Sequence, residues 1–241
     1  MTRAASRRPD AVAVVPAGGV GSRMGAREPK QYLRAGGAPI LIHSLRALLK
    51  SPAIGGVVLA VPADRVAGTE RLLERHGLGR LTTVVAGGAE RQESVWRALQ
   101  ALPLGPGFIV VHDAVRPFID RALVERVLDA ARRTGAAICG LPIRETVKRV
   151  REGAVEATLD REGLWTVQTP QAFRRDLLWE AHDKARRDGF TGTDDAVLVE
   201  RLGERVAVVA GLAGNLKVTT PEDLRAARRR VAARTKGRAG R

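Results

Sequence analysis

Cysteine, aromatic residues and long apolar runs are scarce in this chain of 241 residues. A single cysteine, Cys139, excludes a disulfide framework, and its apolar surroundings (AAICGLPI) indicate a buried thiol in a reducing compartment such as the cytoplasm. Because aromatic residues are only 3% of the chain, the core must be aliphatic. No apolar stretch reaches the roughly 18 residues of a membrane span, and the N-terminal MTRAASRRPD lacks the apolar segment of a signal peptide. We therefore expect a cytoplasmic protein with no membrane contact.

Positive charge, in contrast, is abundant. The chain has 41 Lys and Arg against 26 Asp and Glu, a formal net charge of +15, which on its own would suit nucleic-acid binding. More than half of this excess lies in the first 10 and the last 21 residues, so we expect solvated, partly disordered basic tails at residues 1–10 and 229–241. The remaining charge is spread over the body and would also attract a nucleoside triphosphate.

Apolar runs of strand length alternate with helical patterns through most of the sequence. Residues 11–15, 55–63 and 81–88 read as strands, and residues 40–51 and 90–102 as helices between or after them. This alternation is typical of βαβ units. It predicts one Rossmann-like α/β domain, with a mostly parallel sheet flanked by helices and a body of about residues 11–228.

Residues 143–165 interrupt that rhythm. Two short β-like runs, VKRV and AVEATL, are joined at residues 151–153 and predict a β-hairpin. A hairpin of this size cannot bury its own side chains, so we expect it to protrude as an arm that packs against a second subunit.

A glycine-rich stretch follows the first predicted strand and carries the strongest functional signal. Gly18, Gly19 and Gly21 allow their amides to approach phosphate oxygens closely, and Arg23 and Lys30 add two positive charges. The dinucleotide fingerprint does not fit, because its sixth position is methionine rather than glycine. A P-loop does not fit either, since no Gly-Lys pair followed by Ser or Thr ends the stretch. A triphosphate is the favoured ligand, with a structural turn as the alternative.

Two further polar motifs stand at the ends of predicted strands. GGAERQESV places Gly88, Arg91 and Ser94 where a strand passes into a helix, which is also compatible with an ordinary connection. HDAVRP places Asp113 and Arg116 after an apolar run, where the two could simply pair across a loop. The preceding histidine is expected to pack or to bond to the backbone.

Taken in order, these motifs resemble one nucleotidyltransferase family. P-A-G-G-x-G-x-R-M-G, P-K-Q-Y, G-G-x-E-R-x-x-S-V, H-D-A-x-R-P, D-R-x-G-L-W, T-P-Q-x-F and N-L-K-V-T together resemble the 2-C-methyl-D-erythritol 4-phosphate cytidylyltransferases. The resemblance covers about residues 11–228. It implies transfer of CMP from CTP to a polyol phosphate in non-mevalonate isoprenoid biosynthesis, Mg²⁺ held mainly by the CTP phosphates, and a homodimer formed through the arm.

The resemblance also implies roles for individual residues. The implied catalytic residues are Arg23, Lys30, Arg161 and Lys217. The implied nucleotide-binding residues are Ala17, Gly18, Gly19, Gly21, Gly88, Arg91, Ser94, Asp113 and Ala114. The implied acceptor-binding residues are Asp113, Arg116, Thr146, Arg161 and Lys217, and no protein ligand for a metal is implied. Gly214 and Ala89 depart from the family pattern. These departures leave the cations intact and concern the fine positioning of the substrates rather than activity.

Two alternatives and one local expectation remain. A related cytidylyltransferase could use another polyol phosphate, such as ribitol 5-phosphate, and a basic nucleic-acid or regulatory binding module on the same fold would explain the net charge. In FTGTDDAVLVERLG, Thr193 is predicted to cap a helix, with Asp194 and Asp195 at the positive end of its dipole rather than as metal ligands.

Overall fold

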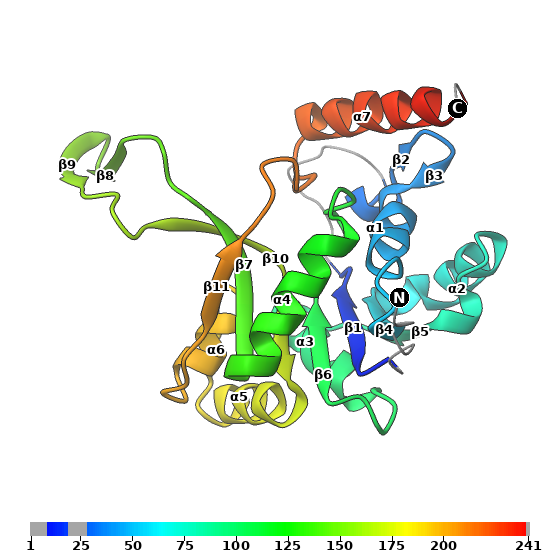
Figure 1. The fold of residues 1–241 in the computed structure, drawn as a ribbon, viewed down its shortest axis with the longest axis horizontal. Coiled ribbons are helices and arrows are strands. Elements are labelled where there is room, and N and C mark those ends of the chain that lie inside the picture. The colour runs from blue at the N-terminus through cyan, green and yellow to red at the C-terminus, as the bar shows by residue number, and fades with distance from the viewer. Residues whose placement is uncertain (1–8, 19–27, 240–241) are drawn as a thin grey trace, which may run out of the picture.

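A seven-stranded sheet forms the centre of the molecule, in the spatial order β11-β7-β10-β6-β1-β4-β5 (Figure 1). The computed structural model describes residues 9–18 and 28–239, with side chains up to residue 234. The seven strands are β1 (Ala11–Pro16), β4 (Ile54–Val61), β5 (Thr82–Ala86), β6 (Phe108–Val111), β7 (Ala136–Pro142), β10 (Trp165–Arg174) and β11 (Ala207–Ala210). β10 runs antiparallel to β6 and β7, and the other neighbouring pairs are parallel. The predicted mostly parallel α/β sheet is confirmed.

Helices cover both faces of this sheet because strand side chains alternate between them. Ala13 and Val15 of β1 pack in a core with α1, α2 and α4, whereas Val12 and Val14 pack in a second core with α3, α5 and α6. The helices are α1 (Ile40–Leu48), α2 (Val66–Arg75), α3 (Arg91–Gln100), α4 (Arg121–Thr134), α5 (Arg175–Arg187), α6 (Ala196–Glu200) and α7 (Pro221–Ala239). Short elements complete the body: η2 (Lys30–Tyr32), β2 (Arg34–Ala35), β3 (Ala38–Pro39), η3 (Ala63–Arg65) and η4 (Gly79–Leu81). A continuous apolar β1 is therefore explained by burial on both sides.

The predicted arm is present as a separate hairpin beyond the end of the sheet (Figure 1). It consists of β8 (Val147–Arg151) and β9 (Ala154–Leu159), which pair antiparallel. The two turn residues, Glu152 and Gly153, have φ values of 51° and 81°, and two successive positive values suit a tight hairpin turn. Strands β7 and β10 lead into and out of this hairpin, so the arm is anchored in the central sheet.

The predicted start of the C-terminal tail is wrong, because residues 229–239 continue helix α7. Ala and Arg, which dominate this stretch, are both good helix formers. α7 also packs on the body: Leu224 and Ala227 are buried with Phe118, and the Arg230 guanidinium lies 4.7 Å from the centre of the Phe118 ring. Within the described part of the chain, no helix has the length and apolarity needed to span a membrane.

Candidate active site

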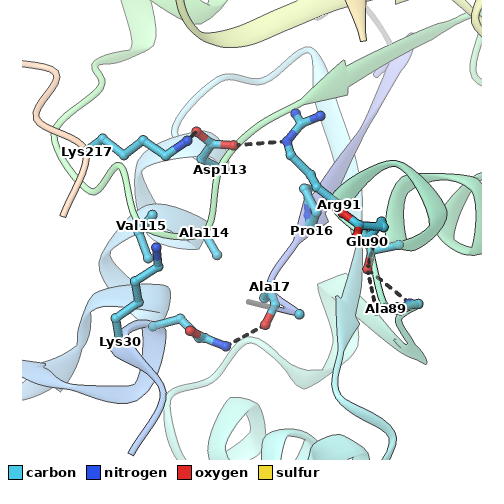
Figure 2. A pocket seen from close by; sticks show the side chains of 14 residues that line it. Pro16, Ala17, Lys30, Ala89, Glu90, Arg91, Asp113, Ala114, Val115 and Lys217 are labelled. Carbon is cyan, nitrogen blue, oxygen red and sulfur yellow. Dashed lines mark hydrogen bonds and ion pairs between the residues drawn. The ribbon is translucent and has the colours of Figure 1, made fainter. Parts of the chain in front are cut away.

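A pocket opens where β1 and β6 end, at the carboxyl edge of the parallel strands. Ligands of open α/β sheets bind at this edge. The pocket is lined by Pro16, Ala17, Gly18, Lys30, Gln31, Gly88, Ala89, Glu90, Arg91, Ser94, Asp113, Ala114, Val115 and Lys217. Figure 2 shows Lys30, Arg91 and Lys217 around the same cavity, although they come from three distant segments of the sequence.

The end of β1 is tied to the segment that carries Lys30. Gln31 is buried and its amide donates a hydrogen bond of 2.5 Å to the carbonyl of Ala17, so the two walls of the pocket are joined beside Lys30. On the other side, a Cβ at Gly18 would lie 3.1 Å from the Ser94 hydroxyl and 3.6 Å from the Gly88 carbonyl. Glycine at position 18 therefore permits the close approach of β1 to the turn before α3.

Ser94 shapes that second glycine turn. Its side chain is buried, its hydroxyl oxygen accepts from the Gly88 amide at 3.1 Å, and its hydroxyl donates to the Glu90 carbonyl at 3.1 Å. These bonds hold residues 87–90 against the first turn of α3. Ser94 thus lines the pocket while fixing the backbone that forms one of its walls.

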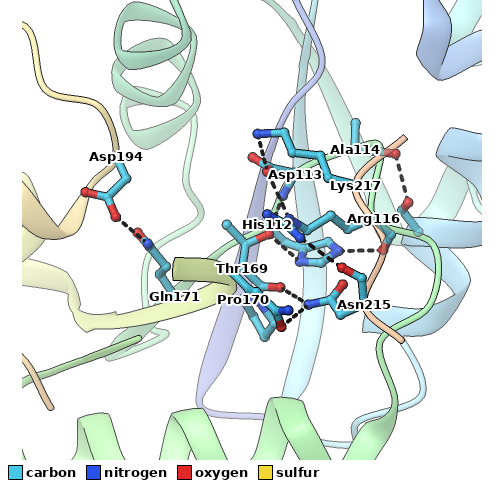
Figure 3. A network of polar contacts seen from close by, with 12 residues as sticks. His112, Asp113, Ala114, Arg116, Thr169, Pro170, Gln171, Asp194, Asn215 and Lys217 are labelled. Atoms are coloured by element: carbon cyan, nitrogen blue, oxygen red, sulfur yellow. Dashed lines mark hydrogen bonds and ion pairs between the residues drawn. The ribbon is translucent and has the colours of Figure 1, made fainter. Parts of the chain in front are cut away.

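Three cationic side chains contact the carboxylate of Asp113. Its carboxylate lies 2.9 Å from the Lys217 ammonium, 3.3 Å from Nε of Arg116 and 3.5 Å from Nε of Arg91 (Figures 2 and 3). Burial alone would raise the pKa of Asp113, but the charges of Arg91, Lys217 and Arg116 hold that pKa well below its ordinary value. Asp113 is therefore ionised. Because three cations surround this one carboxylate, the immediate surroundings retain an excess of positive charge that suits a phosphate.

His112 and its neighbours hold this cluster in place (Figure 3). Nε2 of His112 lies 3.0 Å from the Arg116 carbonyl, which can only accept, so Nε2 carries the hydrogen. Nδ1 then accepts from the Thr169 hydroxyl at 3.1 Å, and the Thr169 oxygen accepts from the Asp113 amide at 3.0 Å. The expectation that His112 bonds to the backbone is confirmed, and its effect is to fix the loop that carries Asp113.

Burial of the neutral ring predicts a pH-dependent stability. Desolvation lowers the pKa of His112 from 6.5 to about 4. Over this window the unfolded chain binds the proton more readily than the folded chain, so the contribution to stability is full above pH 6.5, declines as the pH falls to about 4, and is constant below. The free energy of unfolding of wild type should therefore fall more steeply over this window than that of His112→Gln, by up to about 1.4 kcal/mol per pH unit. Urea denaturation at several pH values measures both slopes, and parallel curves would contradict a buried neutral His112.

Asn215 connects the same network to the segment that carries Lys217. Its side-chain amide Nδ2 donates to the Thr169 carbonyl at 2.8 Å and to Oε1 of Gln168 at 3.1 Å, and its main-chain carbonyl accepts from Arg116 at 2.9 Å. The Lys217 side chain remains 43% exposed while its ammonium contacts Asp113. Lys217 is thus held at the surface of the pocket by a buried scaffold.

The predicted cap at Thr193 is wrong, because the following aspartate takes that role. Oδ1 of Asp194 accepts from the Val197 amide at 3.1 Å at the start of α6, and its Oδ2 accepts from Gln171 at 2.7 Å. Asp195 also differs from the prediction, because its side chain is not exposed at the start of α6. It is 1% exposed, and its carboxylate lies 2.7 Å from Nη1 of Arg91. No local sequence pattern signals this contact, because the two residues are 104 positions apart.

The structure brings most of the predicted site residues together but not all of them. The predicted residues that line the pocket are Ala17, Gly18, Lys30, Gly88, Arg91, Ser94, Asp113, Ala114 and Lys217. Arg116 is buried behind Asp113, and Thr146 and Arg161 lie exposed at the base of the arm, where Arg161 donates to the Arg144 carbonyl. Gly19, Gly21 and Arg23 lie outside the described residues.

A glycine-lined pocket at the carboxyl ends of parallel strands, with several cations around it, is typical of α/β proteins that bind phosphate-bearing ligands such as nucleotides. Known proteins specify the family. The family model for 2-C-methyl-D-erythritol 4-phosphate cytidylyltransferase matches residues 11–232. The chain belongs to this family and is a nucleotidyltransferase.

Individual relatives agree with that assignment. The 2-C-methyl-D-erythritol 4-phosphate cytidylyltransferase of Syntrophus aciditrophicus is 46% identical over 219 residues, which are 90% of this chain and 94% of that protein. The enzyme of the same name from Geobacter metallireducens is 45% identical over 216 residues, 88% of this chain and 93% of that protein. The crystal structure of the Thermus thermophilus enzyme superposes with a TM-score of 0.77 at 39% identity, covering 90% of this chain and 97% of that chain.

Proposed function

We propose that this pocket transfers the cytidylyl group of CTP to 2-C-methyl-D-erythritol 4-phosphate and releases pyrophosphate, a step of isoprenoid biosynthesis. The observation that carries the proposal is the arrangement of Lys30, Lys217 and Arg91 around the cavity beside Asp113. Such an arrangement suits a substrate with several negative charges. Family membership is the reason for choosing cytosine as the nucleobase and 2-C-methyl-D-erythritol 4-phosphate as the acceptor.

The mechanism is a direct displacement. A phosphate oxygen of the acceptor attacks the α-phosphorus of CTP in line, the new P–O bond forms, and the bond to pyrophosphate breaks. Because a phosphate oxygen is already ionised, little help from a general base is needed. Lys30, with Arg23 of the segment outside the described residues, would stabilise the charge that builds on the α-phosphate and the leaving group. Lys217 would position the acceptor at the rim of the pocket.

We propose that Mg²⁺ reaches this site on the CTP phosphates. Asp113 is the most buried carboxylate of the described pocket, and three cations already occupy it. The described residues contain no group of three or more His, Cys, Asp or Glu side chains that would suit a metal ion. The described part of the pocket therefore does not fit a metal held mainly by protein ligands. When bound, the ion would neutralise phosphate charge.

We further propose that the enzyme is a cytoplasmic homodimer in which the arm reaches the partner's pocket. Several large apolar side chains on and beside the arm are exposed in the single chain: Val150, Val155, Leu164, Trp165 and Val167. A second copy of the chain would cover them. Thr146 and Arg161, which lie on this arm away from the pocket of their own chain, would then contribute to the acceptor site of the partner.

A comparison of nucleoside triphosphates tests the preference of the pocket for cytosine. Cytosine and uracil reverse donor and acceptor at one ring position, so a small glycine-lined pocket that binds cytosine through backbone groups would leave buried polar groups unpaired with uracil. We expect kcat/KM for CTP to exceed that for UTP by about a hundredfold or more, and purine triphosphates to be rejected by size. Pyrophosphate release with each triphosphate at fixed acceptor measures this. Equal values for CTP and UTP would contradict the cytidylyl assignment while leaving a nucleotidyltransferase.

A further inference from the structure

Behind the pocket, Arg91 bridges two buried carboxylates. Its Nε faces Asp113 at 3.5 Å and its Nη1 faces Asp195 at 2.7 Å. Asp113 belongs to the loop after β6 and Asp195 precedes α6, so the guanidinium joins two separate parts of the fold. Neither contact requires Nη2, and 30% of the Arg91 side chain stays exposed toward the cavity that it lines. Arg91 is therefore held from behind while it remains accessible to a ligand.

Asp195 is itself held by a buried histidine. Its Oδ1 lies 2.9 Å from Nε2 of His182 on α5, and His182 is fully buried. Since a carboxylate only accepts, Nε2 of His182 carries the hydrogen. Burial would raise the pKa of Asp195, but the charge of Arg91 and the hydrogen bond from His182 lower it below its ordinary value. The carboxylate is thus ionised and has one oxygen for each partner.

The choice of histidine at position 182 is not explained by packing. Its ring stacks on Trp96 at 6.4 Å, a contact that an aromatic hydrocarbon would also make. In the described part of the chain, however, Nδ1 of His182 is buried with no hydrogen-bond partner, which destabilises the fold. A residue with this disadvantage is expected where its other nitrogen is needed, and here that nitrogen contacts Asp195.

We propose that Asp195 and His182 are positioning residues that fix the Arg91 guanidinium for the bound nucleotide. The inference rests on the proposed function, because it takes CTP as the ligand of the pocket. Without the negative charge of Asp195, only Asp113 would hold Arg91, and the guanidinium would move toward that already crowded carboxylate. Preorganisation of the nucleotide contact would then be lost although no residue that lines the pocket had changed.

The first test compares variants at these two positions by calorimetric CTP binding, turnover and melting temperature. Asp195→Asn should weaken CTP binding about tenfold, because a charged partner of Arg91 is lost. His182→Phe should weaken it in the same direction, and His182→Gln should stay near wild type, because the glutamine amide can replace the Nε2 donor. Asp188→Asn, which changes an exposed aspartate at the end of α5, is the matched control. It should leave CTP affinity and turnover unchanged.

The second test asks whether Asp195 acts through Arg91. In an Arg91→Gln background, Asp195→Asn should cause no additional loss of CTP affinity. An equal further loss in that background would overturn the proposal, and so would wild-type affinity in both Asp195→Asn and His182→Phe. If Asp195→Asn fails to fold, the two His182 variants decide: equal CTP affinity in both overturns the inference. Failure of wild type to bind CTP would instead refute the proposed function.

Discussion

Lys30→Ala should lower kcat about a hundred- to a thousandfold while the protein stays folded. Lys30 lines the pocket on η2, next to Gln31, whose amide ties this segment to the end of β1. Its segment is thus fixed beside the end of β1, in the same pocket as Gly18, where we place the phosphates. Removal of one preorganised group that stabilises the transition state typically costs about that factor. Initial rates of pyrophosphate release at saturating CTP and acceptor measure the change.

The matched control is Lys50→Ala, which removes an exposed lysine beyond the end of α1, outside the pocket. It should have the kcat of wild type. Melting temperatures of both variants close to that of wild type would exclude a folding defect. If Lys30→Ala released pyrophosphate at a rate near that of wild type, the assignment of Lys30 to the transferred phosphate would be wrong.

Mixing two inactive variants should restore about a quarter of the wild-type activity. Lys30 lines the pocket, whereas Arg161 is exposed at the base of the arm and donates to the Arg144 carbonyl. If Arg161 acts in the pocket of the partner subunit, Lys30→Ala and Arg161→Ala would each remove one cation from every site of their own homodimer. In a mixed dimer both defects fall in one site, and the other site is intact.

Random reassortment gives about half of the dimers in mixed form, and one of their two sites works. The two variants are denatured and refolded together, and pyrophosphate release is compared with that of each variant refolded alone. Refolded wild type sets the full value, and a mixture of Lys30→Ala with Lys50→Ala, which should show about half of that value in either arrangement, serves as the control for refolding. If both residues serve one subunit, reassorted mixtures of Lys30→Ala and Arg161→Ala contain no intact site and stay as inactive as the parents, which would overturn the trans arrangement. An independent comparison is a Lys30→Ala/Arg161→Ala double variant refolded with wild type.

In that comparison the trans arrangement leaves no intact site in the mixed dimer, because each of its two pockets lacks one residue. The cis arrangement leaves one intact site per mixed dimer. With equal amounts of the two chains, activity should therefore be about a quarter of an all-wild-type sample in trans and about a half in cis. A value near one half would show that Arg161 serves its own subunit.

Local sequence patterns were sufficient for most of the fold. Apolar runs with strand length predicted β1, β4 and β5 to within about two residues. The clearest case is β1, because a strand buried on both faces has no polar position. The hairpin was predictable from the turn at residues 151–153. The C-terminal boundary was not, since the arginines of α7 read as a solvated tail, whereas Arg230 stacks on Phe118.

The candidate site divides in the same way. Gly18, Lys30 and Asp113 belong to motifs next to strand ends, where topology alone places them at one edge of the sheet. The contact between Arg91 and Asp195 joins the start of α3 to the segment just before α6, and no local pattern carries that information. For the same reason the sequence alone predicts Asp195 at the positive end of a helix dipole, although its side chain is buried.

The choice of acceptor tests the proposed reaction most directly. Wild-type protein is incubated with CTP, Mg²⁺ and either 2-C-methyl-D-erythritol 4-phosphate or ribitol 5-phosphate, and the products are followed by phosphorus NMR. We predict pyrophosphate together with a new diphosphate diester, both dependent on the methylerythritol phosphate, and neither product above background with ribitol 5-phosphate. A diester formed equally well from ribitol 5-phosphate, or none from either acceptor, would contradict the proposed reaction.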